Sequence, residues 1–182
     1  MQTQFIFEMK HVKDYIIPFK GLTLGLHPFE YQIKKKFFEA YQYDDFIKSD
    51  ITVKLDFLKK DTLFELFFLM SGTVLVNCDV SGEEYEQPVE GSLKLIVTFG
   101  EAFNNDHEEI LIIPQHVYEL DISQYIYELI VLNTPIKRVH PGILDGTLES
   151  EALDKLDELS RKTEKKTDPR WDKLKELIKD KK

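Results

Sequence analysis

The chain has 182 residues, with 24 Lys and Arg against 33 Asp and Glu, and its formal charge is −9. A domain of this length buries enough surface to form a core without disulfides or metals. Its 42% hydrophobic content is too high for a disordered chain, and its longest apolar run, residues 66 to 70, is about a quarter of a spanning helix. We expect no secretory signal, and the single cysteine, Cys78, excludes an internal disulfide, so we expect a cytoplasmic protein.

The charge is unevenly distributed along the chain. Residues 161–182 carry +5, which leaves −14 on residues 1–160. A body this acidic repels a phosphate backbone, so we do not expect DNA binding. The basic tail is either a solvated helix end or an arm that faces nucleic acid or the ribosome. We expect residues 1–160 to form a single α+β domain and residues 161–182 a basic, loosely docked C-terminal helix.

The first half of the chain predicts short edge strands followed by longer ones. Residues 15–22 and 26–34 contain prolines that suit strand edges, and residues 36–41 suggest a helical turn. Residues 51–57 alternate apolar and polar side chains with the period of a half-buried strand. A second strand follows over residues 63–76, and Ser71-Gly72 within it suggests a bulge or bend.

The second half adds two strands and then changes period. Residues 92–99 complete an antiparallel meander, and residues 110–113 form one more strand. Residues 121–133 have helical spacing, with Asp121 as N-cap and Gln124 in a capping box. Further helices are expected over residues 148–159 and from Asp168-Pro169 onward, where proline occupies the first helical position.

These elements predict an α+β fold: an antiparallel β-sheet curled into a barrel or sandwich, followed by C-terminal helices. If the sheet closes, its aromatic inner face has two possible uses, filling the core or holding a small apolar ligand. The second use gives an alternative function, a small-ligand-binding β-barrel with no ribosomal role. The aromatic candidates for it are Phe64, Phe67, Phe68, Tyr85 and Phe99.

The sequence contains no recognised catalytic motif. The five histidines are scattered, and Cys78 is either a nucleophile activated by a remote histidine or, more commonly, a small buried hydrophobe. Acidic runs such as 83–86 and 106–109 are typical of solvated loops. An enzyme acting on RNA would need clustered acid, base or metal ligands, so we expect no enzyme, no cofactor and no metal site.

One loop concentrates positive charge in the acidic body. Lys137, Arg138 and His140 lie between Pro135 and Pro141, directly after the helix predicted over 121–133. Prolines on both sides restrict the loop and lower the cost of ordering it on a phosphate or carboxylate. Alternatively, the prolines only direct the chain and the cations compensate acidic neighbours.

Residues 120–141 resemble the most characteristic stretch of the YceD family, the large ribosomal RNA subunit accumulation proteins. In that family a helix leads into a Leu-x-x-Pro-x-x-x-x-His pattern. Residues 76–83 resemble its central strand and turn, residues 168–177 are similar to its C-terminal ending, and the whole resemblance spans about 70–180. The matching motif positions are Leu132, Pro135, His140, Pro141, Cys78, Asp168 and Pro169.

The chain departs from the family pattern at one place. Many relatives have Cys-x-x-Cys at the central turn and a further cysteine after the His-Pro loop, a set that could bind zinc. This chain keeps Cys78, has Ser81 at the second position and has no cysteine after His140. The resemblance therefore does not extend to a zinc site.

The resemblance implies a role in accumulation of 23S ribosomal RNA and assembly of the large ribosomal subunit, without catalysis. The implied partners are large-subunit rRNA or a basic ribosomal protein, with no membrane and no DNA. We expect contact through the loop and the basic tail, while the acidic body contacts a basic protein or faces solvent. The expected contact residues are Lys137, Arg138, His140, Arg170, Trp171 and Lys173.

Overall fold

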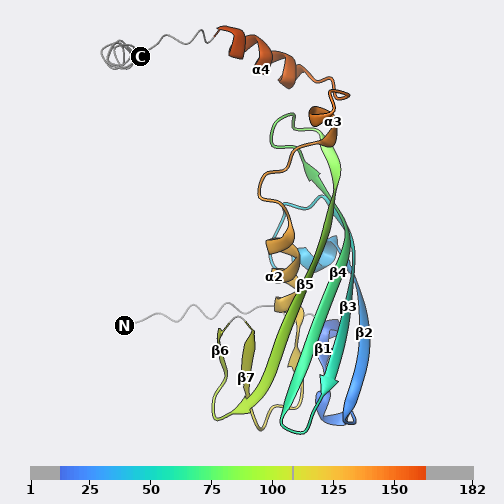
Figure 1. Ribbon diagram of the computed structural model, residues 1–182, viewed down its shortest axis with the longest axis vertical. Helices are drawn as coiled ribbons and strands as arrows, with labels where there is room; N and C mark the ends of the chain where they lie inside the picture. Colours follow the sequence, from blue (N-terminus) through green and yellow to red (C-terminus); the bar gives the residue numbers. More distant parts are fainter. Residues whose placement is uncertain (1–12, 108, 163–182) are drawn as a thin grey trace, which may run out of the picture. The chain divides into compact units, whose positions relative to one another are not determined.

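The computed structural model describes residues 13–107 and 109–162 (Figure 1). Contacts divide the chain into two compact units. The first comprises Met1–Asn77 and Glu84–Arg138, and the second comprises Cys78–Glu83 and Val139–Lys182. Residues 163–182 lie outside the described residues, so the expected basic C-terminal helix stays a prediction.

The first unit is built on a six-stranded sheet with the order β2-β3-β4-β5-β7-β6. Neighbouring strands are antiparallel except β5 and β7, which are parallel. Figure 1 shows the long strands side by side. The strands are β2 (Gly25–Lys34), β3 (Lys48–Lys59), β4 (Leu63–Asn77), β5 (Glu84–Gly100), β6 (Asn104–His107) and β7 (Ile110–Pro114).

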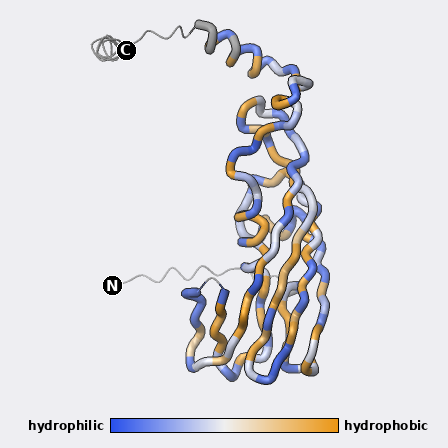
Figure 2. Tube along the Cα trace, in the orientation of Figure 1, coloured by the Kyte–Doolittle hydropathy of each residue, from blue (hydrophilic) through white to orange (hydrophobic). Residues whose placement is uncertain are grey.

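Alternation along the strands buries one face of this sheet. In β3 the apolar residues Ile51, Val53, Leu55 and Phe57 are fully buried, and the residues between them point the other way. Figure 2 shows the same exchange of hydrophobic and hydrophilic positions along the long strands. The inward face predicted for residues 51–57 is therefore confirmed.

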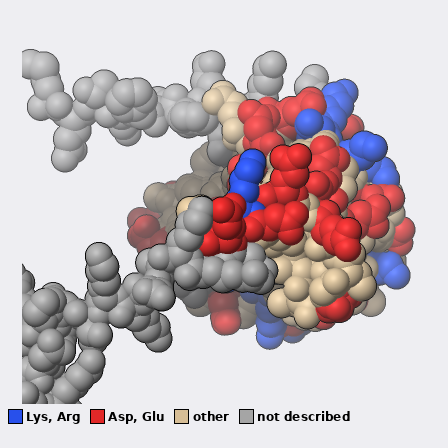
Figure 3. All heavy atoms as spheres, turned by 90° about the horizontal axis from the view of Figure 1, so that it is seen from above, with Lys and Arg blue, Asp and Glu red and all other residues tan. Residues whose placement is uncertain are grey.

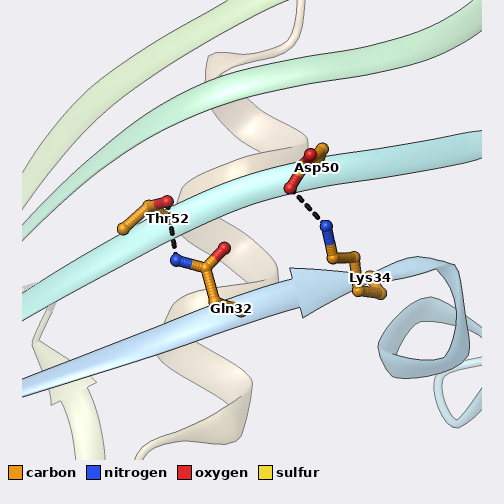
Figure 4. A network of polar contacts seen from close by, with 4 residues as sticks. All are labelled: Gln32, Lys34, Asp50 and Thr52. Atoms are coloured by element: carbon orange, nitrogen blue, oxygen red, sulfur yellow. Dashed lines mark hydrogen bonds and ion pairs between the residues drawn. The ribbon is translucent and has the colours of Figure 1, made fainter.

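The opposite face carries polar pairs between β2 and β3. Gln32 Nε2 donates to Thr52 Oγ1 at 2.9 Å, and the Lys34 ammonium pairs with the Asp50 carboxylate (Figure 4). Both members of the ion pair are more than half exposed, so it contributes at most about 1 kcal/mol. These pairs mark the solvent side of an edge strand.

Short elements cover the buried face. Phe19 packs against Phe64 with ring centroids 4.8 Å apart, and Lys59 Nζ donates to the carbonyls of Phe19 and Leu22. Two of these elements, β1 and β8, pair as a small second sheet. The covering elements are the 3₁₀ helices η1 (Lys13–Tyr15) and η2 (Phe19–Gly21), the strands β1 (Ile16–Ile17) and β8 (Leu120–Asp121), and the helices α1 (Lys35–Glu39) and α2 (Ser123–Asn133).

In the second unit, the turn Cys78–Glu83 is closed by two backbone hydrogen bonds. Cys78 N donates to Glu83 O at 2.8 Å, and Gly82 N donates to Cys78 O at 2.9 Å. In the described part of this unit, the helices α3 (Pro141–Leu144) and α4 (Glu151–Lys162) follow. No helix in the described part of the chain is long and apolar enough to cross a membrane.

The predicted barrel or sandwich is wrong. The six-stranded sheet ends at β2 on one side and β6 on the other, so it is open, and the described chain is mostly β. The helices are also not confined to the C-terminal end, because α1 lies between β2 and β3. Alternation predicts that one face is buried but not what covers it, and here helices and short segments cover it.

The alternative of a small-ligand-binding β-barrel therefore loses its basis. Phe64, Phe68 and Tyr85 are core residues of the open sheet. Phe67 is 46% exposed on the opposite face, so it does not share a surface with them.

Two local predictions also need correction. Gly72 marks no bulge: it pairs with Ile51 within an uninterrupted register. A Cβ at Gly72 would lie 2.2 Å from Asp50 O, so glycine is required there for close approach of two backbones. Residues 15–22 form only the two-residue β1 between 3₁₀ turns, whereas the edge strand over 26–34 is confirmed as β2.

The start of α2 differs from the predicted capping box, because the N-cap residue is Ile122 and not Asp121. Asp121 Oδ1 accepts from the backbone N–H of Ser123 at 2.8 Å and from its hydroxyl at 2.6 Å. Gln124 does not reach back, because its Nε2 donates forward to Glu128 Oε1 at 2.8 Å. The predicted end is confirmed, since α2 stops at Asn133, two residues before Pro135.

Candidate functional site

The loop after α2 begins from a helix end that is closed by hydrogen bonds from Asn133 and Thr134. Thr134 donates from its backbone N–H and from its hydroxyl to Ile130 O, the latter at 2.8 Å, and Asn133 Nδ2 donates to Leu129 O at 2.7 Å. The chain then becomes exposed, with Ile136 98% accessible. Lys137 follows on the same exposed stretch. Of the predicted contact residues, Lys137 is therefore the one that the loop presents to solvent.

Arg138 forms an ion pair within the first unit. Its guanidinium lies 3.4 Å from Asp45 Oδ2, and its side chain is 22% exposed. Asp45 belongs to the segment between α1 and β3, far away in sequence. The ion pair joins this segment to the end of the loop, so Arg138 compensates an acidic residue, as the alternative interpretation of the loop expects.

A cluster of tyrosine rings lies beside this ion pair, and the sequence pattern did not predict it. Tyr41 stacks on Tyr127 of α2 with centroids 4.4 Å apart and planes within 6°. Tyr43 meets Tyr127 edge-on at 5.9 Å. Burial and the Asp45 carboxylate raise the pKa of Tyr43, and the Arg138 guanidinium opposes that rise. These rings hold the segment before β3 against α2.

His140, in the second unit, caps α3. Its Nδ1 accepts from the backbone N–H of Gly142 at 2.9 Å, and Pro141 occupies the first turn of the helix. An Nδ1 that accepts carries no proton, so the neutral ring bears its proton on Nε2. The backbone N–H of His140 also donates to Cys78 Sγ at 3.3 Å. Through these two hydrogen bonds, His140 contacts both the start of α3 and the turn at Cys78.

Cys78 is buried and is a hydrogen-bond acceptor. Its sulfur accepts from the backbone N–H groups of Val80 and Ser81, both at 3.4 Å, in addition to that of His140. Burial raises the pKa of the thiol, but the hydrogen bonds from Ser81, His140 and Val80 outweigh burial and lower the pKa to about 7. The arrangement stabilises a thiolate inside a turn.

The residues at this turn do not fit the cysteine set that the family resemblance associates with zinc binding. Ser81 stands where the second cysteine would be; its hydroxyl hydrogen-bonds Cys78 and accepts from Glu83 N at 3.3 Å. The Nδ1 of His140 is already engaged by Gly142. Within residues 13–107 and 109–162, no group of three or more His, Cys, Asp or Glu side chains could hold a metal ion.

A pocket of about 510 Å³ lies between β5, β6 and α2 in the first unit, and sequence reasoning did not find it. Leu132, the first residue of the family-like motif, lines it and is 81% exposed. Asp106 and Glu128 supply carboxylates, and Tyr125 donates its hydroxyl to Asn105 Oδ1 at 3.1 Å. No sequence motif signals this pocket because its walls come from three separate segments.

The distribution of charge agrees with the acidic composition. Figure 3 shows Asp and Glu side chains covering much of the face drawn, with Lys and Arg scattered among them.

The other predicted contact and motif residues lie outside the described residues. They are Asp168, Pro169, Arg170, Trp171 and Lys173.

Comparison with known proteins supports the resemblance seen in the motif. The family model described as large ribosomal RNA subunit accumulation protein YceD matches residues 67–178. The match includes most of β4, all of β5 and α2, the turn at Cys78 and the loop leading to His140. No curated protein and no solved structure matches the chain. Because the family model covers more than half of the sequence, the chain belongs to the YceD family, whose name links it to large-subunit ribosomal RNA.

Proposed function

We propose that this protein supports the accumulation of 23S ribosomal RNA and assembly of the large ribosomal subunit by binding rather than by catalysis. The observation that carries the proposal is the family match over residues 67–178. The environments of Cys78 and His140 support a binding role. The thiol is buried and accepts backbone hydrogen bonds, and the imidazole caps a helix, so both groups have structural partners.

Lys137 is our candidate for direct contact with rRNA. It is exposed on the loop after α2, whereas Arg138 pairs with Asp45 and His140 caps α3. Replacing all three residues together would therefore disturb the fold as well as the contact. A single charge reversal, Lys137→Glu, isolates the contribution of charge, because a phosphate contact from a lysine depends on its positive charge.

The test is deletion of the gene followed by complementation. We expect the deletion to lower 23S rRNA and the large-subunit peak in a sucrose gradient, and the wild-type chain to restore both. Lys137→Glu should restore them only partly. Lys36→Glu is the matched control, because Lys36 is an exposed lysine of α1. It should complement fully.

Two outcomes contradict the proposal at different levels. A normal rRNA content and gradient profile in the deletion strain would remove the assembly function. If the deletion lowers 23S rRNA as expected but Lys137→Glu complements fully, the assembly function stands and Lys137 is excluded as the contact.

A further inference from the structure

Strand β5 has an open edge over most of its length. Strand β4 pairs with β5 from Glu84 to Thr98, but β7 pairs only with Ile96–Gly100 on the other side. Within the described residues, no strand pairs with residues 84–95 on that side. A sheet edge of this kind presents backbone N–H and C=O groups that can accept a further strand.

The direction of these groups follows from the pairing with β7. The backbone N–H of Ile96 donates to Glu109 O at 2.8 Å, so Ile96 points toward the edge. Alternate residues of a strand point the same way, which places the N–H and C=O groups of Lys94, Ser92 and Glu90 on the edge.

Toward the N-terminal end of β5, Pro88 prevents further backbone pairing at this edge. Proline has no N–H to donate, and the Pro88 carbonyl already accepts from Gln87 Nε2 at 2.9 Å. The stretch available for pairing therefore runs from Glu90 to Lys94 and is centred on Ser92.

The pocket lies directly at this stretch, because Ser92 and Leu93 form part of its wall. Leu129 and Leu132 of α2 add apolar surface, and Asp106 and Glu128 add two carboxylates. An apolar wall beside carboxylates matches the chemistry of a lysine or arginine side chain, with a hydrocarbon stem and a cationic head.

Neither carboxylate is neutralised within the described chain. Asp106 Oδ2 accepts from the Asn104 amide at 2.9 Å, and Glu128 Oε1 accepts from the Gln124 amide at 2.8 Å. Both donors are neutral, and in residues 13–107 and 109–162 no ion pair within 4.0 Å involves Asp106 or Glu128. The pocket thus retains negative charge that a cationic ligand can neutralise.

We infer that an extended basic polypeptide segment pairs with the β5 edge at Glu90–Ser92 and places a lysine or arginine side chain in the pocket against Asp106 and Glu128. This inference rests on the proposed function for the source of the segment, a basic protein of the large subunit. Charge complementarity selects the partner, because the acidic body and the two pocket carboxylates repel phosphate and attract cationic side chains.

The experiment measures binding of a fluorescently labelled peptide, in which lysine alternates with threonine, to the full-length chain by anisotropy. Ser92→Pro removes the edge N–H without removing a bond to β4, and Pro88 shows that β5 accepts proline on the same side. Asp106→Asn with Glu128→Gln removes the charge and keeps the shape. We expect each change to weaken binding about tenfold or more.

Two control variants separate the site from general effects. Ser92→Thr keeps the edge N–H, and Glu39→Gln with Asp44→Asn removes the same charge from exposed positions elsewhere. Both should bind the peptide like the wild type. Thermal unfolding of every variant identifies any that fails to fold, and in that case Ser92→N-methylalanine, introduced by ligation, replaces Ser92→Pro.

Several results would overturn the inference. Equal weakening by the charge-matched control would show nonspecific attraction, and unchanged binding by Ser92→Pro would exclude strand pairing. If a single-stranded RNA oligonucleotide binds more tightly than the peptide, and the pocket variants lose this RNA binding, the pocket would be assigned to RNA.

A different combination separates the inference from the proposed function. If the peptide binds as expected but the deletion strain keeps normal rRNA, the proposed function is overturned and the docking site stands.

Discussion

The imidazole of His140 accepts the backbone N–H of Gly142 at 2.9 Å, and the two residues fit each other closely. A Cβ at Gly142 would lie 2.9 Å from His140 Nδ1 and equally close to Leu148 Cβ. The small residue therefore lets the ring approach the helix terminus and cap it. The histidine of the family-like motif has a structural function that its motif does not reveal.

Replacing this histidine tests the cap. His140→Ala should lower the free energy of unfolding of the unit by about 1 kcal/mol, because the N–H of Gly142 loses its acceptor. His140→Asn should retain most of the stability, since the asparagine oxygen is also a good cap. Urea denaturation followed by circular dichroism measures both, and equal losses for the two variants would rule out capping.

Because the pKa of the Cys78 thiol is lowered in the folded chain, we expect the free energy of unfolding to increase with pH. Its pKa in the folded chain is lowered to about 7 from an ordinary value of 9.0. Between these values the unfolded state holds the proton and the native state does not, so stability rises as pH increases from 7 to 9, by on the order of 2 kcal/mol. The rise is lost as pH falls through 7.

The measurement compares unfolding of the wild type with that of Cys78→Ala across this pH range. The difference between the two curves isolates the thiol from all other titrating groups. A parallel pair of curves would show that the thiol keeps its ordinary pKa.

We expect that adding a single carbon at Gly72 lowers the stability of the fold. Gly72→Ala places a Cβ 2.2 Å from Asp50 O, so β3 and β4 must separate. The expected loss is about 1 to 3 kcal/mol. Gly21→Ala is the control, because a Cβ there meets nothing within 4 Å. Thermal unfolding should distinguish the two variants, and similar melting temperatures would contradict the close approach of the strands.

At the start of α2, we expect replacement of Asp121 and of Gln124 to affect the free energy of unfolding differently. Asp121→Ala should cost about 1 kcal/mol, because the N–H and the hydroxyl of Ser123 lose their acceptor. Gln124→Ala should be nearly neutral, since the Gln124 amide donates an exposed hydrogen bond to Glu128 Oε1 and does not reach the helix terminus. Chemical denaturation provides the comparison. A larger loss for Gln124 would restore the capping box that the structure excludes.

Much of the sheet could be predicted because alternation is a local property. The buried set from Ile51 to Phe57 follows from period-two spacing, and the end of α2 follows from Asn133 and Pro135. Gly72 could not be interpreted correctly in the same way. Its neighbour is the backbone of Asp50 on another strand, and no local pattern records that distance.

The candidate site was predicted only in part for the same reason. The sequence identified the loop with Lys137, Arg138 and His140 from its charge and prolines. It did not identify Asp45 as the partner of Arg138, because the two residues are separated by 93 positions. The pocket beside Leu132 was missed entirely, since three separate elements form it.

The sequence by itself determined the alternating strands, the helix after residue 121, the acidic balance of the body and membership of the YceD family. These properties depend on the identity and spacing of neighbouring residues. Only the tertiary structure decided that the sheet stays open, that Cys78 accepts the N–H of His140, and that among the described residues no strand covers the β5 edge beside the pocket. Those features arise from contacts between distant segments, whose energies depend on packing of the whole chain rather than on local preference.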